Sequence, residues 1–287
     1  MEGIFKIAQN SEIAFIGVPP QNTINPAPFG DDLQTILKDK FMNKLIALFA
    51  AALIAVSAAP FAQAQETESS FPGDFSANIA MTSDYTFRGI SQSDEGPAIQ
   101  GGFDYSYNDE TDAFPGFYAG IWGSNVDFND GDEASMEIDG YAGFQGTIDQ
   151  TGTDWKLGGI YYWYPGADDD LNYDFWEVAG SLTHDFGPFA LSGAVNYSPE
   201  YFGETGDAWY FSSAATVPLP YDLSLNAHLG YQDVEDAADY LDWSAGLGYS
   251  WNGFNFAVNY IDTDLDEPEE CFDGCSERVV FTVSRAF

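Results

Sequence analysis

Charged side chains interrupt several aromatic-rich segments of this 287-residue chain at alternate positions. Alternate residues of a β-strand point to the same side, so each segment gathers its charges on one face. Rows of carboxylates inside a pore concentrate cations and repel anions, and basic side chains among them narrow the passage. The carboxylates at such positions are Asp84, Asp104, Glu137, Asp139, Glu177 and Asp242, and the bases are Arg88, Lys156 and Arg278.

Catalytic residues are not evident in the sequence. The chain has two histidines, His184 and His228, and neither has a nucleophile near it in the sequence. There is no G-x-S-x-G motif, no pair of histidines at metal-ligand spacing and no glycine loop for phosphate. We therefore expect no enzyme, no cofactor and no metal centre.

The only cysteines, Cys271 and Cys275, stand close together near the end of the chain. In an exported protein the oxidising compartment makes a disulfide the expected state. No histidine lies near them, so the C-x3-C spacing makes a poor metal site. We expect a disulfide, with free thiols or a metal site as the alternatives.

The chain is strongly acidic, with a formal net charge of -38 at pH 7. Such a surface repels nucleic acid, which is bound by basic footprints. Residues 262–266 carry Asp at alternate positions, like the start of a calcium loop, but Glu267 stands where that loop needs glycine. We interpret the acidic connections as solvated loops. Weak binding of divalent cations, bridging to lipopolysaccharide phosphates, is the alternative.

Twelve segments alternate apolar or aromatic residues with polar ones, which predicts β-strands. The first is predicted to run unbroken from Phe75 to Arg88. Every proline after Ala64 falls before or between the segments, as expected because proline has no N–H for a strand ladder. The segments begin near residues 75, 98, 116, 135, 154, 173, 189, 208, 221, 241, 254 and 277.

Three features favour a transmembrane barrel over a soluble sandwich. Aromatic residues such as Phe75, Phe87 and Trp251 end the apolar faces, as aromatic girdles require. Connections alternate between short turns, such as Asn252-Gly253, and longer acidic loops. The last segment ends at Phe287 with apolar residues on the same face, which resembles the terminal strand by which outer-membrane proteins are recognised for assembly. Arg285 departs from this pattern and is expected to reach the membrane interface.

An export signal precedes the predicted strands. Met42-Asn43-Lys44 is followed by a short apolar run and by Ala62-Gln63-Ala64, which is the pattern of a secretory signal peptide over residues 42–64. We expect cleavage after Ala64, with residues 65–287 forming one barrel domain. Residues 1–41 are interpreted as an N-terminal extension that results from a start codon assigned too early.

Several motifs resemble those of the TorF-family porins, a family long described only as conserved hypothetical proteins. The first lies at Asp84–Ser93, the second combines Gly116–Gly120 with Ser124–Phe128, and the next two lie at Glu137–Gly143 and Gly158–Gly166. The resemblance covers most of the predicted barrel. It implies a porin-type barrel of the outer membrane and no particular solute.

The sequence thus predicts an all-β protein, a transmembrane antiparallel up-and-down β-barrel of about twelve strands, in the cell outer membrane of a Gram-negative bacterium. The predicted function is passive diffusion of small hydrophilic solutes through a porin-like channel that prefers cations. In the alternative, the bases pair with carboxylates and close the lumen, and the barrel is structural or adhesive, with acidic loops that bind divalent cations or surface partners. Expected partners are outer-membrane lipid and lipopolysaccharide, the barrel-assembly machinery, and small solutes or cations.

Overall fold

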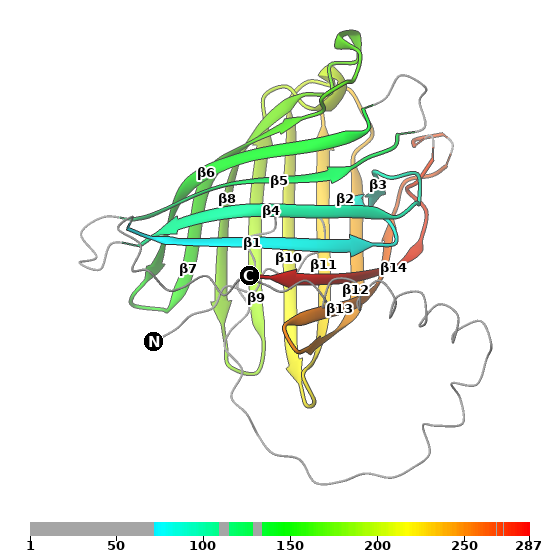
Figure 1. Cartoon of the computed structure of the whole chain (residues 1–287). Coiled ribbons are helices and arrows are strands. Elements are labelled where there is room, and N and C mark those ends of the chain that lie inside the picture. Colours follow the sequence, from blue (N-terminus) through cyan, green and yellow to red (C-terminus); the bar gives the residue numbers. More distant parts are fainter. Residues whose placement is uncertain (1–71, 109–114, 129–133, 268, 272) are drawn as a thin grey trace, which may run out of the picture. The chain divides into compact units, whose positions relative to one another are not determined.

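Twelve long strands form one closed antiparallel barrel (Figure 1). Each strand pairs with its neighbours along the chain, and β1 closes the barrel by pairing with β14. The predicted fold class and strand number are confirmed. The predicted N-terminal extension and signal peptide lie outside the described residues. The computed structural model describes residues 72–108, 115–128, 134–267, 269–271 and 273–287.

Each barrel strand begins within two residues of its predicted start. The barrel strands are β1 (Asp74–Thr82), β4 (Ala98–Tyr107), β5 (Gly116–Asn125), β6 (Met136–Ile148), β7 (Thr153–Trp163), β8 (Phe175–Asp185), β9 (Ala190–Ser198), β10 (Ala208–Leu219), β11 (Leu223–Val234), β12 (Tyr240–Trp251), β13 (Phe254–Thr263) and β14 (Arg278–Ala286). Two short strands, β2 (Thr86–Phe87) and β3 (Ile90–Ser91), form a separate hairpin. Short 3-10 helices η2 (Asp169–Leu171) and η3 (Phe202–Glu204) lie in connections. Among the described residues, no helix is long and apolar enough to cross a membrane.

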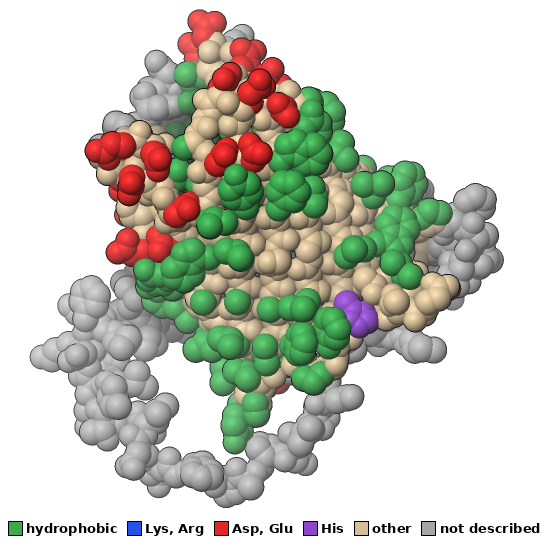
Figure 2. Space-filling view, turned by 180° about the vertical axis from the view of Figure 1, so that it is seen from behind, with side chains coloured by type: hydrophobic (Ala, Val, Ile, Leu, Met, Phe, Trp, Pro, Cys, Tyr) green, Lys and Arg blue, Asp and Glu red, His purple; other side chains and the backbone are tan. Residues whose placement is uncertain are grey.

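The barrel is apolar outside and polar inside, the reverse of a soluble protein. On β11, Leu225, Leu229 and Tyr231 are exposed, whereas the inward-pointing Gln232 is completely buried. Figure 2 shows hydrophobic side chains over the outer wall and carboxylates gathered at one end. A soluble sandwich would bury these apolar side chains. Their exposure excludes that alternative and fits a wall that faces lipid.

The connections differ between the two ends of the barrel. One end, which we call the turn end, carries short turns such as residues 149–152 and 186–189. At another of these turns Asn252 and Gly253 have positive φ angles of 50° and 80°, as the predicted type I′ turn requires. The opposite end, the loop end, carries the longer connections, and the carboxylates in Figure 2 gather there.

The first strand is shorter than predicted. β1 ends at Thr82, whose hydroxyl donates to the carbonyl oxygen of Asp84 at 2.7 Å. Residues 83–97, which we name the inward hairpin, then leave the wall and contain β2 and β3. Positive φ angles at Arg88 (49°) and Gly89 (83°) reverse the chain at the tip of this hairpin.

The prediction that Phe87 joins an outer aromatic girdle is therefore wrong. Its ring centre lies 5.8 Å from that of Tyr162, a buried residue of the inner wall. The polar residues of this segment find ionic and hydrogen-bonding partners inside the barrel, which a position in the wall would not provide. The alternation of apolar and polar residues continues through the bend, so this pattern alone does not reveal the bend.

A positive charge on the outer wall is expected to destabilise the barrel. Leu229 lies near the middle of β11 and is 52% exposed. Leu229→Arg should lower the free energy of unfolding in lipid vesicles by about 2–4 kcal/mol, the cost of an arginine at the bilayer midplane. Leu229→Ala is the control, because it removes the apolar side chain without adding a charge. Equal losses for the two variants in urea titrations would contradict a lipid-facing wall.

Candidate functional site

The inward hairpin reaches the wall of the barrel with its tip. At Gly89, a Cβ atom would lie 2.9 Å from the Cβ of Asp242 on β12 and 2.5 Å from the Cγ2 of Thr263 on β13. The residue also has a positive φ of 83°. The tip approaches the wall this closely because glycine has no side chain and tolerates this backbone conformation.

Arg88 fixes the hairpin to two further strands. Its Nη2 donates to both carboxylate oxygens of Glu177 on β8, each at 2.8 Å. Its Nη1 donates to Oε1 of Gln232 on β11 at 2.6 Å. The side chains of Arg88 and Glu177 are 3% and 1% exposed. Removing one partner of such a buried pair is costly because the other charge is left uncompensated, so the contact holds the hairpin in the lumen.

Neighbouring side chains replace water around this ion pair. The guanidinium of Arg88 lies 4.2 Å from the ring centre of Tyr210. Glu177 accepts hydrogen bonds from Nδ2 of Asn196 at 2.8 Å and from the hydroxyl of Tyr162 at 3.3 Å. Both charges are therefore surrounded by polar groups and ring faces that compensate for lost hydration.

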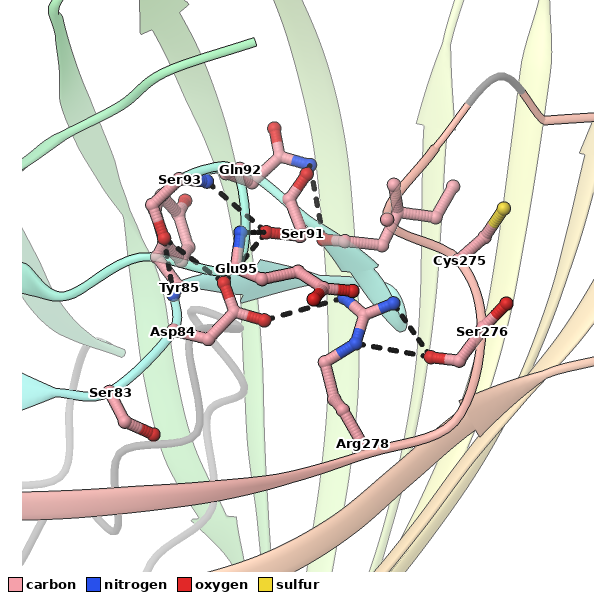
Figure 3. A network of polar contacts seen from close by, with 12 residues as sticks. Ser83, Asp84, Tyr85, Ser91, Gln92, Ser93, Glu95, Cys275, Ser276 and Arg278 are labelled. Carbon is pink, nitrogen blue, oxygen red and sulfur yellow. Dashed lines mark hydrogen bonds and ion pairs between the residues drawn. The ribbon is translucent and has the colours of Figure 1, made fainter. Parts of the chain in front are cut away.

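Asp84 anchors the base of the hairpin (Figure 3). Its Oδ1 accepts from the hydroxyls of Ser91 at 2.7 Å and Ser93 at 3.0 Å. Its Oδ2 lies 3.3 Å from Nη1 of Arg278. Nη2 of the same guanidinium donates to the carbonyl oxygen of Ser276 at 2.7 Å. Asp84 thus connects the hairpin to the start of β14 and to the loop before it.

The loop between β13 and β14 packs on the inward hairpin. Cys271 and Cys275 form a disulfide within this loop, and Cys275 is completely buried. The N–H of Ser91 in the hairpin donates to the carbonyl oxygen of Gly274 at 2.7 Å. The disulfide loop therefore contacts β3 directly and adds a second connection between hairpin and wall.

Glu267 shapes the disulfide loop. Its Oε1 accepts from the backbone N–H groups of Cys275 at 2.9 Å and Ser276 at 3.1 Å. These donors, the Cys275 amide first, hold the pKa of Glu267 below its ordinary value. Glu267 also lies close to both sulfur atoms. Because a disulfide offers no thiolate to a metal, we do not interpret this group as a metal centre.

Four of the five remaining predicted lumen residues lie in two places, and the fifth, Asp242, lies beside His228. Glu137 and Asp139 on β6 are almost completely buried, and Tyr85 of the hairpin donates to Glu137 Oε1 at 2.8 Å. Asp104 on β4 and Lys156 on β7 lie nearer the turn end, apart from the hairpin. There Asp104 accepts a hydrogen bond from Tyr141, and the Lys156 ammonium lies 5.3 Å from the ring centre of Tyr118.

His228 forms part of the inner wall beside Asp242. Its Nε2 lies 2.9 Å from Asp242 Oδ1 and 3.0 Å from the hydroxyl of Tyr210. A catalytic relay uses one ring nitrogen for the nucleophile and the other for the orienting carboxylate, whereas here one nitrogen makes both contacts. This geometry is that of a structural hydrogen-bond network. His184 lies at the turn end, with Nδ1 3.0 Å from the hydroxyl of Thr153.

The sequence analysis missed the uncharged members of the site. Tyr85, Tyr162, Tyr210 and Gln232 are all buried and contact the charged groups. For Tyr162, Tyr210 and Gln232 the signal is positional, because each occupies an inward register of its strand; Gln232, for example, follows the exposed Tyr231. Tyr85 has no such signal, since the alternation places it on the outward face and only the turn after Thr82 brings it inside. Aromatic residues occur on both faces of these strands, so residue type alone does not assign them to the lumen.

A closed barrel with an apolar outer wall and a polar, charged interior defines the class of outer-membrane β-barrel proteins, and the protein belongs in the cell outer membrane. The chain is a member of the family described as "Bacterial protein of unknown function (Gcw_chp)", whose model matches residues 64–287. No curated protein matches the chain by sequence.

Solved structures with similar barrels include two porins and a channel. The KdgM porin has a TM-score of 0.48 at 6% identity, over 74% of this chain and 98% of that chain. The NanC porin has a TM-score of 0.49 at 10% identity, over 75% of this chain and 99% of that chain. An outer-membrane channel from Pseudomonas putida F1 has a TM-score of 0.47 at 8% identity, over 76% of this chain and 96% of that chain.

Loss of either partner of the Arg88–Glu177 pair is expected to destabilise the barrel. Arg88→Gln and Glu177→Gln each leave a buried charge without its partner, which should lower the free energy of unfolding by about 3–5 kcal/mol. The double variant should lose less than the sum of the two, because the contact is removed only once. Urea titration of all four proteins in vesicles measures this coupling, and additive losses would rule out a direct pair.

Gly274→Ala is expected to loosen the inward hairpin. A Cβ at Gly274 would lie 3.1 Å from the Cβ of Ser91, and the residue has a φ of +80°. Gly253 has the same φ of +80°, but a Cβ there would meet nothing closer than 3.9 Å. Gly253→Ala is therefore a control for backbone strain. Hydrogen exchange of residues 84–93 should rise in Gly274→Ala alone; no difference would show that the loop does not hold the hairpin.

Proposed function

We propose that the protein is a porin-like channel through which small hydrophilic solutes diffuse across the outer membrane, with a preference for cations. The observation that carries this proposal is a hairpin folded into a polar, acidic lumen and fixed there by Arg88. In such a channel the hairpin sets the width of the passage. The wall carboxylates set its charge.

The charge balance inside the barrel supports the cation preference. Two of the bases are engaged by carboxylates, since Arg88 pairs with Glu177 and Arg278 pairs with Asp84. Carboxylates of a wall with low dielectric focus a negative potential along the passage, which attracts cations. Outside these two pairs, the proposed lumen residues comprise four carboxylates and one base. The carboxylates are Asp104, Glu137, Asp139 and Asp242, and the base is Lys156.

The hairpin supports passage of small solutes only. Barrels of about eight strands are filled by side chains and those of about sixteen enclose an aqueous channel, so twelve strands leave an intermediate lumen. Here Tyr85, Arg88 and Gly89 occupy part of that lumen, from the β6 wall to the β12 wall. We infer that ions and small polar molecules fit the remaining space.

The membrane environment supplies the other proposed partners. The exposed apolar wall supports contact with outer-membrane lipid, and the acidic loop end supports cation-bridged contact with lipopolysaccharide. Val279, Phe281 and Phe287 of the last strand region are exposed, which supports recognition by the barrel-assembly machinery. The resemblance to the TorF-family porins is consistent with the same function.

A barrel closed to solutes is the second candidate, and the burial of the hairpin contacts favours it. Tyr85, Glu137 and Gln232 are at most 1% exposed. In this case the ion pairs only stabilise the fold. The acidic loop end, seen in Figure 2, would then be the functional surface, which binds divalent cations or surface partners.

Single-channel recording of the refolded barrel in a planar bilayer tests the proposal. Under a potassium chloride gradient we expect discrete current steps with a reversal potential that favours potassium. Arg88→Gln should raise the unit conductance, because it releases the hairpin from Glu177 and Gln232. Arg285→Gln should leave it unchanged and is the control for lost charge, since its guanidinium lies over Phe254 and Phe287.

The recording also separates the two candidates. A folded, heat-modifiable wild-type barrel that carries no current would contradict the channel and support the closed barrel. Current without ion preference would contradict only the role given to the wall carboxylates.

A further inference from the structure

Arg285 on β14 places a positive charge on the outer wall of this acidic barrel. Its cross-strand neighbour Ile79 on β1 is 47% exposed, and the alternate residues Val279 and Phe281 of β14 are exposed as well. Because alternate residues of a strand share a face, Arg285 points outward. The other arginine and lysine side chains that the structure describes lie inside the barrel, and they belong to Arg88, Lys156 and Arg278.

Arg285 lies at the turn end of the barrel. It pairs with Phe254 on β13, which directly follows the turn at Asn252 and Gly253. Exposed aromatic side chains at the same end include Trp251 and Phe287, and such a girdle lies at the depth of the lipid headgroups. Short turns of transmembrane barrels face the periplasm, where phospholipids form the leaflet of the outer membrane. Arg285 is therefore at the level of phospholipid headgroups.

Two aromatic rings hold the Arg285 guanidinium. Its central carbon lies 4.9 Å from the ring centre of Phe254 and 5.2 Å from that of Phe287. Phe287 is itself fixed to β1, because its N–H donates to the carbonyl oxygen of Ala77 at 2.8 Å and its carbonyl oxygen accepts from the N–H of Ala77 at 3.2 Å. The rings stabilise the cation through their faces and limit the orientations of the guanidinium plane.

The rings do not replace an anion as a partner. Arg88 and Arg278 each bind a carboxylate inside the barrel. The ion pairs of the described residues do not include Arg285, and its Nε has no hydrogen-bond partner among them. A guanidinium presents a planar fork of donors that matches a phosphate group with two parallel hydrogen bonds. The chemistry of this position therefore fits the phosphate of a headgroup.

We propose that Arg285 binds the phosphate of a glycerophospholipid in the periplasmic leaflet. The guanidinium donates to two phosphate oxygens, and the rings of Phe254 and Phe287 keep it in place for this contact. Met81 and Phe281, which are 45% and 53% exposed on the adjoining wall, accommodate the acyl chains. The carboxylates seen in Figure 2 gather at the opposite end of the barrel, so they do not repel the phosphate.

Native mass spectrometry of the refolded barrel in detergent tests this site. The probes are phosphatidylglycerol and a diacylglycerol with the same acyl chains but no phosphate. Wild type should bind phosphatidylglycerol about tenfold or more tightly than diacylglycerol, and Arg285→Gln should lose this preference, because it removes the charge-assisted hydrogen bonds. Lys156→Gln is the matched control, since it removes the same charge from the inner wall, and it should keep the preference.

A second variant separates the charge from the geometry of the guanidinium. Arg285→Lys keeps the charge without the planar fork and should bind phosphatidylglycerol severalfold more weakly than wild type. It also carries the test if Arg285→Gln fails to give a heat-modifiable, folded barrel, because affinity equal to that of wild type would overturn the bidentate contact.

The remaining outcomes also decide the proposal. Equal affinity of wild type for the two lipids, or the same loss in Arg285→Gln and Lys156→Gln, would overturn it. Inorganic phosphate at millimolar concentration should not displace phosphatidylglycerol. Displacement would show that the site takes free phosphate, and would overturn the lipid as the occupant.

This site depends on the lipid-facing wall and not on the proposed channel. Lipid preference in an electrically silent barrel would contradict the channel and keep the site, whereas current without lipid preference would do the reverse. Because Arg285 lies outside the lumen, Arg285→Gln is expected to lose lipid affinity at unchanged conductance.

Discussion

The placement of the Arg88 guanidinium inside the barrel is the interaction on which the rest of the lumen depends. A buried guanidinium needs an opposite charge and further acceptors, and Glu177 with Gln232 provides them from two strands. This requirement draws the chain after β1 away from the wall. It also explains the glycine that follows Arg88, because a side chain at Gly89 would collide with β12 and β13.

The lipid outside imposes the complementary constraint. All backbone groups of a membrane-spanning sheet must pair within it, which a closed barrel achieves, and its outer face must be apolar. Most polar side chains of the wall are therefore confined to the inner face. The pairs Arg88–Glu177 and Arg278–Asp84 hold the hairpin, and Tyr85 of the hairpin donates to Glu137 on β6.

Much of this architecture could be predicted from the sequence because alternation at period two is a strong signal over strands this long. The positions of the twelve strands followed from it, and so did the burial of Glu177, Glu137 and Asp242. The inward turn after Thr82 could not be predicted, since the same alternation continues to Phe87. The pairing of Arg88 with Glu177 could not be predicted either, because that contact joins residues far apart in the chain and depends on barrel closure.

The central claim is that the inward hairpin narrows an ion-conducting lumen. The most direct measurement replaces residues 85–96 with a short glycine-serine turn and compares its unit conductance with that of wild type in a planar bilayer, after both have been shown to be folded by heat modifiability. If the hairpin narrows the lumen, this variant should have a conductance several times that of wild type and should let larger solutes pass. A folded variant with the same conductance and ion preference as wild type would contradict it.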